Sequence, residues 1–255
     1  MKRSLLFFAI ILLTANLAYG HGSLEFIDLH GAEAGAKGEF SFHVQYDYMV
    51  EDKADPTQDH WEFTPGISWG IIEGLTFDIH THFAKFGSSL LLFQHQAAYE
   101  PMGPSPFFEA LAVSLQYTLP LDLAFDTAFV VVYEYPYGRS QTLLGGGVVI
   151  EGILSLGYDF GTHSNITINV KYGVDDGDSF SEWGLGFKMP LTADGHGISA
   201  GIEFMGDFED INNSWSVLPG IYLPLGDEYT IFKTGLQMGK DLDTMRVNAT
   251  LLYTF

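Results

Sequence analysis

The stretch MRVNATLLYTF, residues 245–255, alternates apolar and polar side chains up to its last residue. The apolar set is Met245, Val247, Ala249, Leu251, Tyr253 and Phe255, and the polar residues between them are Arg246, Asn248, Thr250 and Thr254. A period of two is typical of a β-strand with one apolar face and one polar face. The sequence therefore predicts a strand over residues 243–255, with its alternation maintained to the final ring.

The same period recurs along the chain from residue 39 onward. The candidate strands are 39–48, 61–69, 77–83, 88–100, 107–119, 121–135, 143–160, 165–172, 182–189, 198–204, 213–225, 228–239 and 243–255. Most of them, with their flanks, are about 10–13 residues long, the length that a tilted crossing of a membrane requires. No helical period is visible in this part of the chain.

The first twenty residues have the pattern of a secretory signal peptide. Lys2 and Arg3 begin it, an apolar run over 5–13 follows, and the small residues Ala18 and Gly20 fit the −3 and −1 positions of a cleavage site. Without Lys2 and Arg3 the 11 basic residues fall to nine against 32 acidic ones, and the net charge moves from −21 to −23. So acidic a chain is not expected to bind nucleic acid.

The composition of the polar face of the candidate strands distinguishes a transmembrane β-barrel from a soluble β-sandwich. That face carries small polar residues and glycine, among them Ser41, Ser68, Gly184, Gly186 and Gly201, which suit the wall of a lumen better than a surface in bulk water. The opposite face is rich in Phe, Tyr and Trp, as an aromatic girdle at the membrane interface requires. The chain contains no cysteine, so disulfides do not hold the fold. An antiparallel transmembrane β-barrel is the predicted class.

The number of strands follows from where the two ends of the chain must lie. A single-chain bacterial barrel has an even number of strands with both termini in the periplasm, whereas the list above has thirteen. We expect 12 strands, with 121–135 acting as a strand extension or loop hairpin; 14 is the alternative if 22–30 also pairs. The predicted organisation is a signal peptide at 1–20, a periplasmic segment at 21–37 and an outer-membrane barrel at 38–255.

In lipid every backbone group must be bonded within the sheet, so the last strand must close on the first. A strand patterned to Phe255 suits that closure, and a carboxy-terminal aromatic resembles the signal that the barrel-assembly machinery reads. We therefore expect contacts with outer-membrane lipid and with that machinery, and a location in the outer membrane of a Gram-negative bacterium.

The order of these features resembles the outer-membrane transporter-like barrels grouped with the phenol-degradation MetA-pathway proteins. The resemblance rests on EFSFHVQYDYM (39–49), WEFTPGISWGIIEGLTFDIH (61–80), SPFFEALAVSLQYTLP (105–120), LSLGYDFGTHSNITINVKYG (154–173), SWSVLPGIYLPLGDEYTIFKTGLQMG (214–239) and TLLYTF (250–255). It implies a barrel and a transport role, and it transfers no binding or catalytic residue to this chain.

Histidine and acidic residues gather on the first three candidate strands. A register set by the lengths of the two connections aligns inward-facing residues in the rows His43–Gly66–Asp78, Gln45–Thr64–His80 and Asp47–Glu62–His82. Imidazole and carboxylate are ligands of Cu²⁺ or Zn²⁺, so a metal site at His43, Glu62, Asp78, His80 and His82 is one interpretation. A hydrogen-bonded polar lining of an aqueous lumen is the other.

The remaining lumen acids bear on function. Asp126, Glu151, Glu182 and Glu203 are expected to face the lumen and, with Glu62 and Asp78, to favour cations or neutral solutes over anions. No serine lies in a nucleophile-elbow context, and we do not expect an enzyme. The leading hypothesis is a channel or transporter for a small solute. A structural or adhesive surface barrel, or a metal-handling outer-membrane protein, is the alternative.

Overall fold

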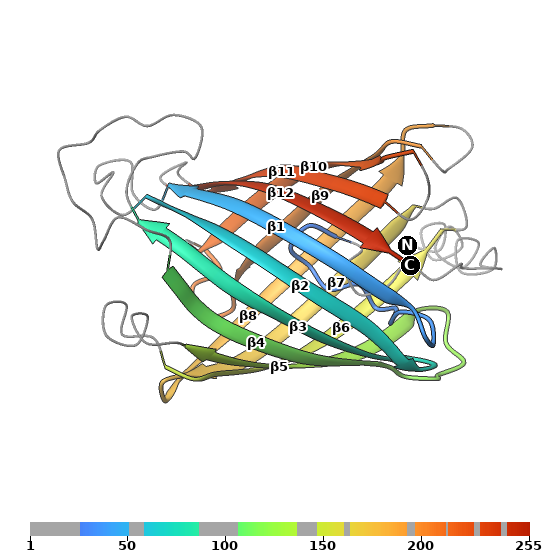
Figure 1. Cartoon of the computed structure of the whole chain (residues 1–255), viewed down its shortest axis with the longest axis horizontal. Helices are drawn as coiled ribbons and strands as arrows, with labels where there is room; N and C mark the ends of the chain where they lie inside the picture. Colours follow the sequence, from blue (N-terminus) through green and yellow to red (C-terminus); the bar gives the residue numbers. More distant parts are fainter. Residues whose placement is uncertain are drawn as a thin grey trace, which may run out of the picture.

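The fold is a closed barrel of twelve antiparallel strands (Figure 1). The computed structural model describes residues 26–50, 59–86, 107–136, 147–160, 164–192, 197–212, 214–226, 230–240 and 244–255. Its strands are β1 (Phe40–Val50), β2 (His60–Ile72), β3 (Leu75–Phe86), β4 (Phe107–Thr118), β5 (Asp126–Pro136), β6 (Val149–Asp159), β7 (Asn165–Asp175), β8 (Asp178–Pro190), β9 (Ser199–Asp207), β10 (Trp215–Pro224), β11 (Thr230–Gly239) and β12 (Met245–Thr254). Among the described residues, no helix is long and apolar enough to span a membrane.

The barrel closes through β1 and β12, as the alternation at the carboxy terminus predicts. These strands pair from Ser41 opposite Thr254 to Val50 opposite Met245. Beyond the ladder, the Phe40 amide donates to the Phe255 carbonyl (3.1 Å) and the Phe255 amide donates to the Phe40 carbonyl (2.8 Å). No edge is left open in the ring of strands, which is the condition for a sheet in lipid.

The two faces of the strands separate apolar from polar side chains. On β12, Val247 and Leu251 are 47% and 39% exposed, whereas Asn248 and Thr250 are 0% and 5% exposed. The exposed apolar residues continue around the outside of the ring, for example Ile67, Leu115, Phe129, Leu154, Val170, Leu185 and Ile221. An outer surface of this kind suits hydrocarbon, and the inward face is polar.

The predicted count of twelve strands is confirmed. The segment 121–135, which was expected not to form a separate strand of the ring, nevertheless contains one. The prediction for 121–135 was wrong, because β5 pairs along its length with both β4 and β6. Its inward face carries Ala128 and Val130, 0% and 1% exposed. With apolar residues on both faces, β5 lacks the alternation that marks the other strands.

Two other candidate stretches, 88–100 and 22–30, bear on the strand count. The stretch 88–100 lies outside the described residues, and β3 pairs directly with β4. Residues 26–30, the described part of 22–30, are not in a strand, so the alternative of fourteen strands is not supported.

The connection between the candidate strands 165–172 and 182–189 is a tight hairpin. Strands β7 and β8 continue to Asp175 opposite Asp178, so only Asp176 and Gly177 form the turn. Both have positive φ, 46° and 97°, the backbone of the type I′ turn that an Asp-Gly pair favours. We call the end of the barrel where β1 begins and β12 ends the terminal rim, and the opposite end, which holds this hairpin, the loop rim.

The described residues 26–36, which precede β1, lie within the ring of strands (Figure 1). In residues 26–36, which we call the inner segment, Phe26, Ile27, Leu29 and Ala32 are buried, from 2% to 8% exposed. The sequence predicts a periplasmic segment at 21–37, and the backbone of its described part is bonded to side chains of the inner wall.

Candidate functional site

The inner segment is anchored first at Glu203 on β9. The Glu203 carboxylate, 0% exposed, accepts hydrogen bonds from the amides of Ile27 (2.8 Å), Asp28 (3.0 Å) and Leu29 (3.0 Å). A fourth hydrogen bond to Glu203 comes from the Tyr222 hydroxyl at 3.2 Å. Since a buried backbone group needs a partner, this carboxylate supplies what a neighbouring strand would supply in a sheet.

Side chains from four further strands continue the anchoring toward the terminal rim. Asn169 accepts from the His30 amide (2.8 Å), and the His30 carbonyl accepts from Ser155 (2.8 Å) and from Asn169 (3.0 Å). Gln116 donates to the carbonyls of residues 31 and 33, Thr118 bonds the backbone of residues 32 and 34, and Thr76 accepts from the amide of residue 35. The inner segment thus follows the wall from β9 round to β3.

Glycines on the inward face make room for the inner segment. A Cβ built on Gly184 would lie closer than 3.0 Å to Leu29, and one on Gly220 would lie closer than 3.0 Å to Ile27. A Cβ on Gly157 would lie 2.8 Å from the Ala32 Cβ. From the sequence, the small residues of this face were predicted to form the wall of a lumen. The structure shows that these glycines also form the surface against which the inner segment packs.

The basic residues of the β8–β12 side of the wall also hold the inner segment. The Lys188 ammonium lies over the Phe26 ring, 5.9 Å from its centroid, and Lys233 donates to the Phe26 carbonyl at 3.0 Å. Arg246 forms an ion pair with Asp28 and lies 3.5 Å from Asp47. These positive charges are therefore engaged by the segment.

The β1–β3 side of the wall carries the predicted histidine and acid residues. His43, Asp78 and His80, which we call the inner-wall cluster, offer ligand atoms that all lie within 4.8 Å of one another. The His80 Nδ1 atom is 2.6 Å from one Asp78 carboxylate oxygen, and His43 Nδ1 is 3.8 Å from the other. The Ser68 hydroxyl also donates to Asp78, at 2.6 Å.

The register that brings the cluster together was predicted for one pair of strands and missed for the other. The β1–β2 rows His43–Gly66 and Asp47–Glu62 are as expected. Along β3, however, Gly66 lies opposite His80, not Asp78. The observed β2–β3 register differs from the predicted one by two residues, which keeps every side chain on its predicted face. The pairing also shifts by one residue between Gly70 and Ile72, close to the turn.

The other two residues predicted for a metal site lie beside the cluster rather than in it. The Glu62 carboxylate is 3.5 Å from His60, and the His82 imidazole is 3.8 Å from Glu134. The rings of His80 and His82 are nevertheless close, with centroids 5.1 Å apart.

The predicted lumen acids have different surroundings. Glu151 and Glu182 flank Lys171, whose ammonium is 3.8 Å and 2.6 Å from them. Asp126 is half-buried at the beginning of β5. Glu203 alone among them is fully covered, because it binds the inner segment.

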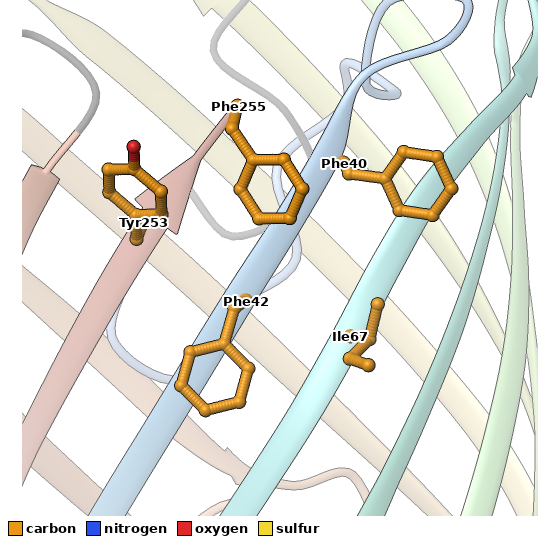
Figure 2. Close-up of a pocket in the computed structure, with 5 residues that line it drawn as sticks. All are labelled: Phe40, Phe42, Ile67, Tyr253 and Phe255. Atoms are coloured by element: carbon orange, nitrogen blue, oxygen red, sulfur yellow. The ribbon is translucent and has the colours of Figure 1, made fainter.

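Phe255 lies on the outer surface at the closing seam. Figure 2 shows it with Tyr253, Phe40, Phe42 and Ile67 around an apolar hollow at the terminal rim. The Phe40 and Phe255 rings stack with centroids 6.1 Å apart. This position, 66% exposed, presents the last ring outward from the barrel.

Two solved structures resemble this barrel over most of its length. One is a KdgM porin in complex with disordered oligogalacturonate, with 7% identity, a TM-score of 0.59, and coverage of 84% of this chain and 99% of the porin. The other is an outer-membrane channel from Pseudomonas putida F1, with 11% identity, a TM-score of 0.63, and coverage of 90% and 100%. No protein-family model and no curated protein matches the sequence.

At these identities the likeness shows the fold: a closed barrel of the kind that outer-membrane porins have. Function has to be argued from the lumen. The resemblance to the phenol-degradation MetA-pathway group stays a prediction.

Proposed function

We propose that the protein is a narrow outer-membrane channel for small cationic or neutral solutes, with its own inner segment occupying part of the lumen. The observation that carries this proposal is the closed ring with an apolar outer face and a polar inner face. That combination is what a water-filled path through lipid requires. Export by the signal peptide, lipid contact along the outer face, and assembly guided by Phe255 belong to the same proposal.

The charge of the inner wall supports the choice of solute. The β1–β5 side carries the carboxylates of Asp47, Glu62, Asp78 and Glu134 together with imidazoles. On the other side, Lys188, Lys233 and Arg246 are engaged by the inner segment. A lumen whose positive charges are covered and whose acids line one wall favours cations over anions. The porin above is named with an anionic oligosaccharide, and the acidic wall argues for a different solute here.

The test is ion selectivity in a planar bilayer. Under a KCl gradient, the wild type is expected to give a reversal potential on the cation side, and the double variant Glu62→Gln/Glu134→Gln a value closer to zero. Glu73→Gln, in the β2–β3 turn outside the lumen, is the matched control and should behave as wild type. Channels with the same reversal potential in all three proteins would refute the role of the acidic wall. A folded protein that passes no current and lets no sugar into liposomes would refute the channel itself and favour a structural barrel.

A further inference from the structure

We infer that the inner-wall cluster is a binding site for a divalent transition-metal ion, with His43, Asp78 and His80 as its protein ligands. The donors come from two adjacent strands. His43 is on β1, and Asp78 and His80 are on β3, so the site spans β2, where Gly66 lies between the two imidazoles.

Gly66 is what lets the two strands share a site. A Cβ built at this position would lie closer than 3.0 Å to both His43 Nε2 and the His80 Cβ. Any larger residue would separate the two imidazoles. The glycine therefore creates a passage across β2 through which His43 reaches the β3 residues.

The second observation is an imidazole nitrogen without a partner. His43 is 6% exposed, and its Nδ1 atom is buried with no hydrogen-bond partner among the described residues. It points into the cluster, 3.8 Å from an Asp78 oxygen. A buried polar atom left unbonded is costly, and a metal ion at this place would supply the missing bond.

The donor set defines the class of ion. Two imidazoles and one carboxylate suit Zn²⁺ and its neighbours Co²⁺, Ni²⁺ and Cu²⁺, whereas Mg²⁺ and Ca²⁺ prefer oxygen ligands. Three protein ligands also leave a coordination position for water or a further donor. His82 is the imidazole nearest on the same strand, its ring centroid 5.1 Å from that of His80.

The inference is tested by metal uptake of the full chain, purified in detergent without a polyhistidine tag. Zn²⁺ binding is measured by titration calorimetry, and ligand type is read from the visible absorption of the Co²⁺ form. We expect one Zn²⁺ per chain, not displaced by excess Mg²⁺. His43→Ala and His80→Ala should weaken binding by about 100-fold or more, since losing even a hydrogen-bonding partner of a ligand typically costs about 10- to 100-fold.

Two further variants separate this site from general histidine binding. Gly66→Ala keeps all three ligands but pushes the His43 ring away, so it should also weaken Zn²⁺ uptake. His60→Ala removes a lumen histidine of β2 that pairs with Glu62 and should bind as wild type. Folding of each variant is checked by circular dichroism, and Asp78→Asn serves if a histidine variant fails to fold. Wild type without Zn²⁺ uptake, or equal loss in His60→Ala and His43→Ala, would overturn the inference. Because uptake is measured without a membrane, its failure is distinct from failure to conduct.

Discussion

Deletion of residues 26–36 is expected to raise the single-channel conductance several-fold and to move the reversal potential toward the anion side. The conductance should rise because this segment lies along the inner wall from β9 to β3 and fills cross-section that solution would otherwise occupy. The shift follows because the deletion frees Lys188, Lys233 and Arg246, which now bind the segment. Both effects are read from one planar-bilayer recording in a KCl gradient.

The deletion leaves every strand of the ring intact, so circular dichroism should report a folded barrel. A folded variant with wild-type conductance would contradict the assignment of the inner segment to the lumen. A larger conductance with an unchanged reversal potential would support the claim that the inner segment fills part of the cross-section. It would refute the claim that the segment masks the basic residues.

The second large effect is expected at Glu203, the residue that holds the start of the inner segment. Glu203→Leu leaves the amides of residues 27–29 without their acceptor. A buried donor left unsatisfied costs about 1–3 kcal/mol, so the bound position of the segment should lose roughly 3 kcal/mol or more. Since about 1.4 kcal/mol corresponds to a factor of ten, release of the segment should become frequent. Recordings should then switch between the wild-type conductance and the larger level of the deletion.

Glu134→Leu is the matched control for this substitution. It also removes a lumen carboxylate, but Glu134 lies on β5 beside His82, whereas the amides of residues 27–29 are bonded by Glu203 on β9. It is expected to alter selectivity without producing the second conductance level. Appearance of the larger level in Glu134→Leu as well would show that lost charge, rather than lost anchoring, releases the segment.

The barrel could be predicted from the sequence because most strands alternate apolar and polar residues. That alternation depends only on which face of the sheet, lipid or lumen, each side chain occupies. The period of two over 245–255 placed Asn248 and Thr250 inward, where they are buried, and Leu251 outward. The β1–β2 register was also predictable. The β2–β3 register was not, because registers that differ by two residues place every side chain on the same face, so the facing pattern does not distinguish them.

The inner segment was not predictable from its own pattern. Its amides and carbonyls bond to side chains such as Glu203 and Asn169, so it needs no periodicity of its own. The available signal was on the strands that receive it, where glycine stands at inward positions such as 157, 184 and 220. Glycines clustered on the inner face indicate that another chain segment approaches closely. Which segment approaches is a question of tertiary structure that the sequence pattern does not address.

The most direct test of the account is a disulfide that holds the inner segment against the wall. The chain has no cysteine of its own, and a Cβ on Gly157 would lie 2.8 Å from that of Ala32. A disulfide needs about 3.5–4.5 Å between these atoms, so Ala32→Cys/Gly157→Cys requires a shift of about 1 Å. The pair is introduced into Glu203→Leu, and the disulfide is verified by mass spectrometry. Oxidised channels should remain at the wild-type conductance, and reduction should restore switching to the larger level. Persistence of the larger level with the disulfide intact would contradict the claim that the inner segment sets the open cross-section.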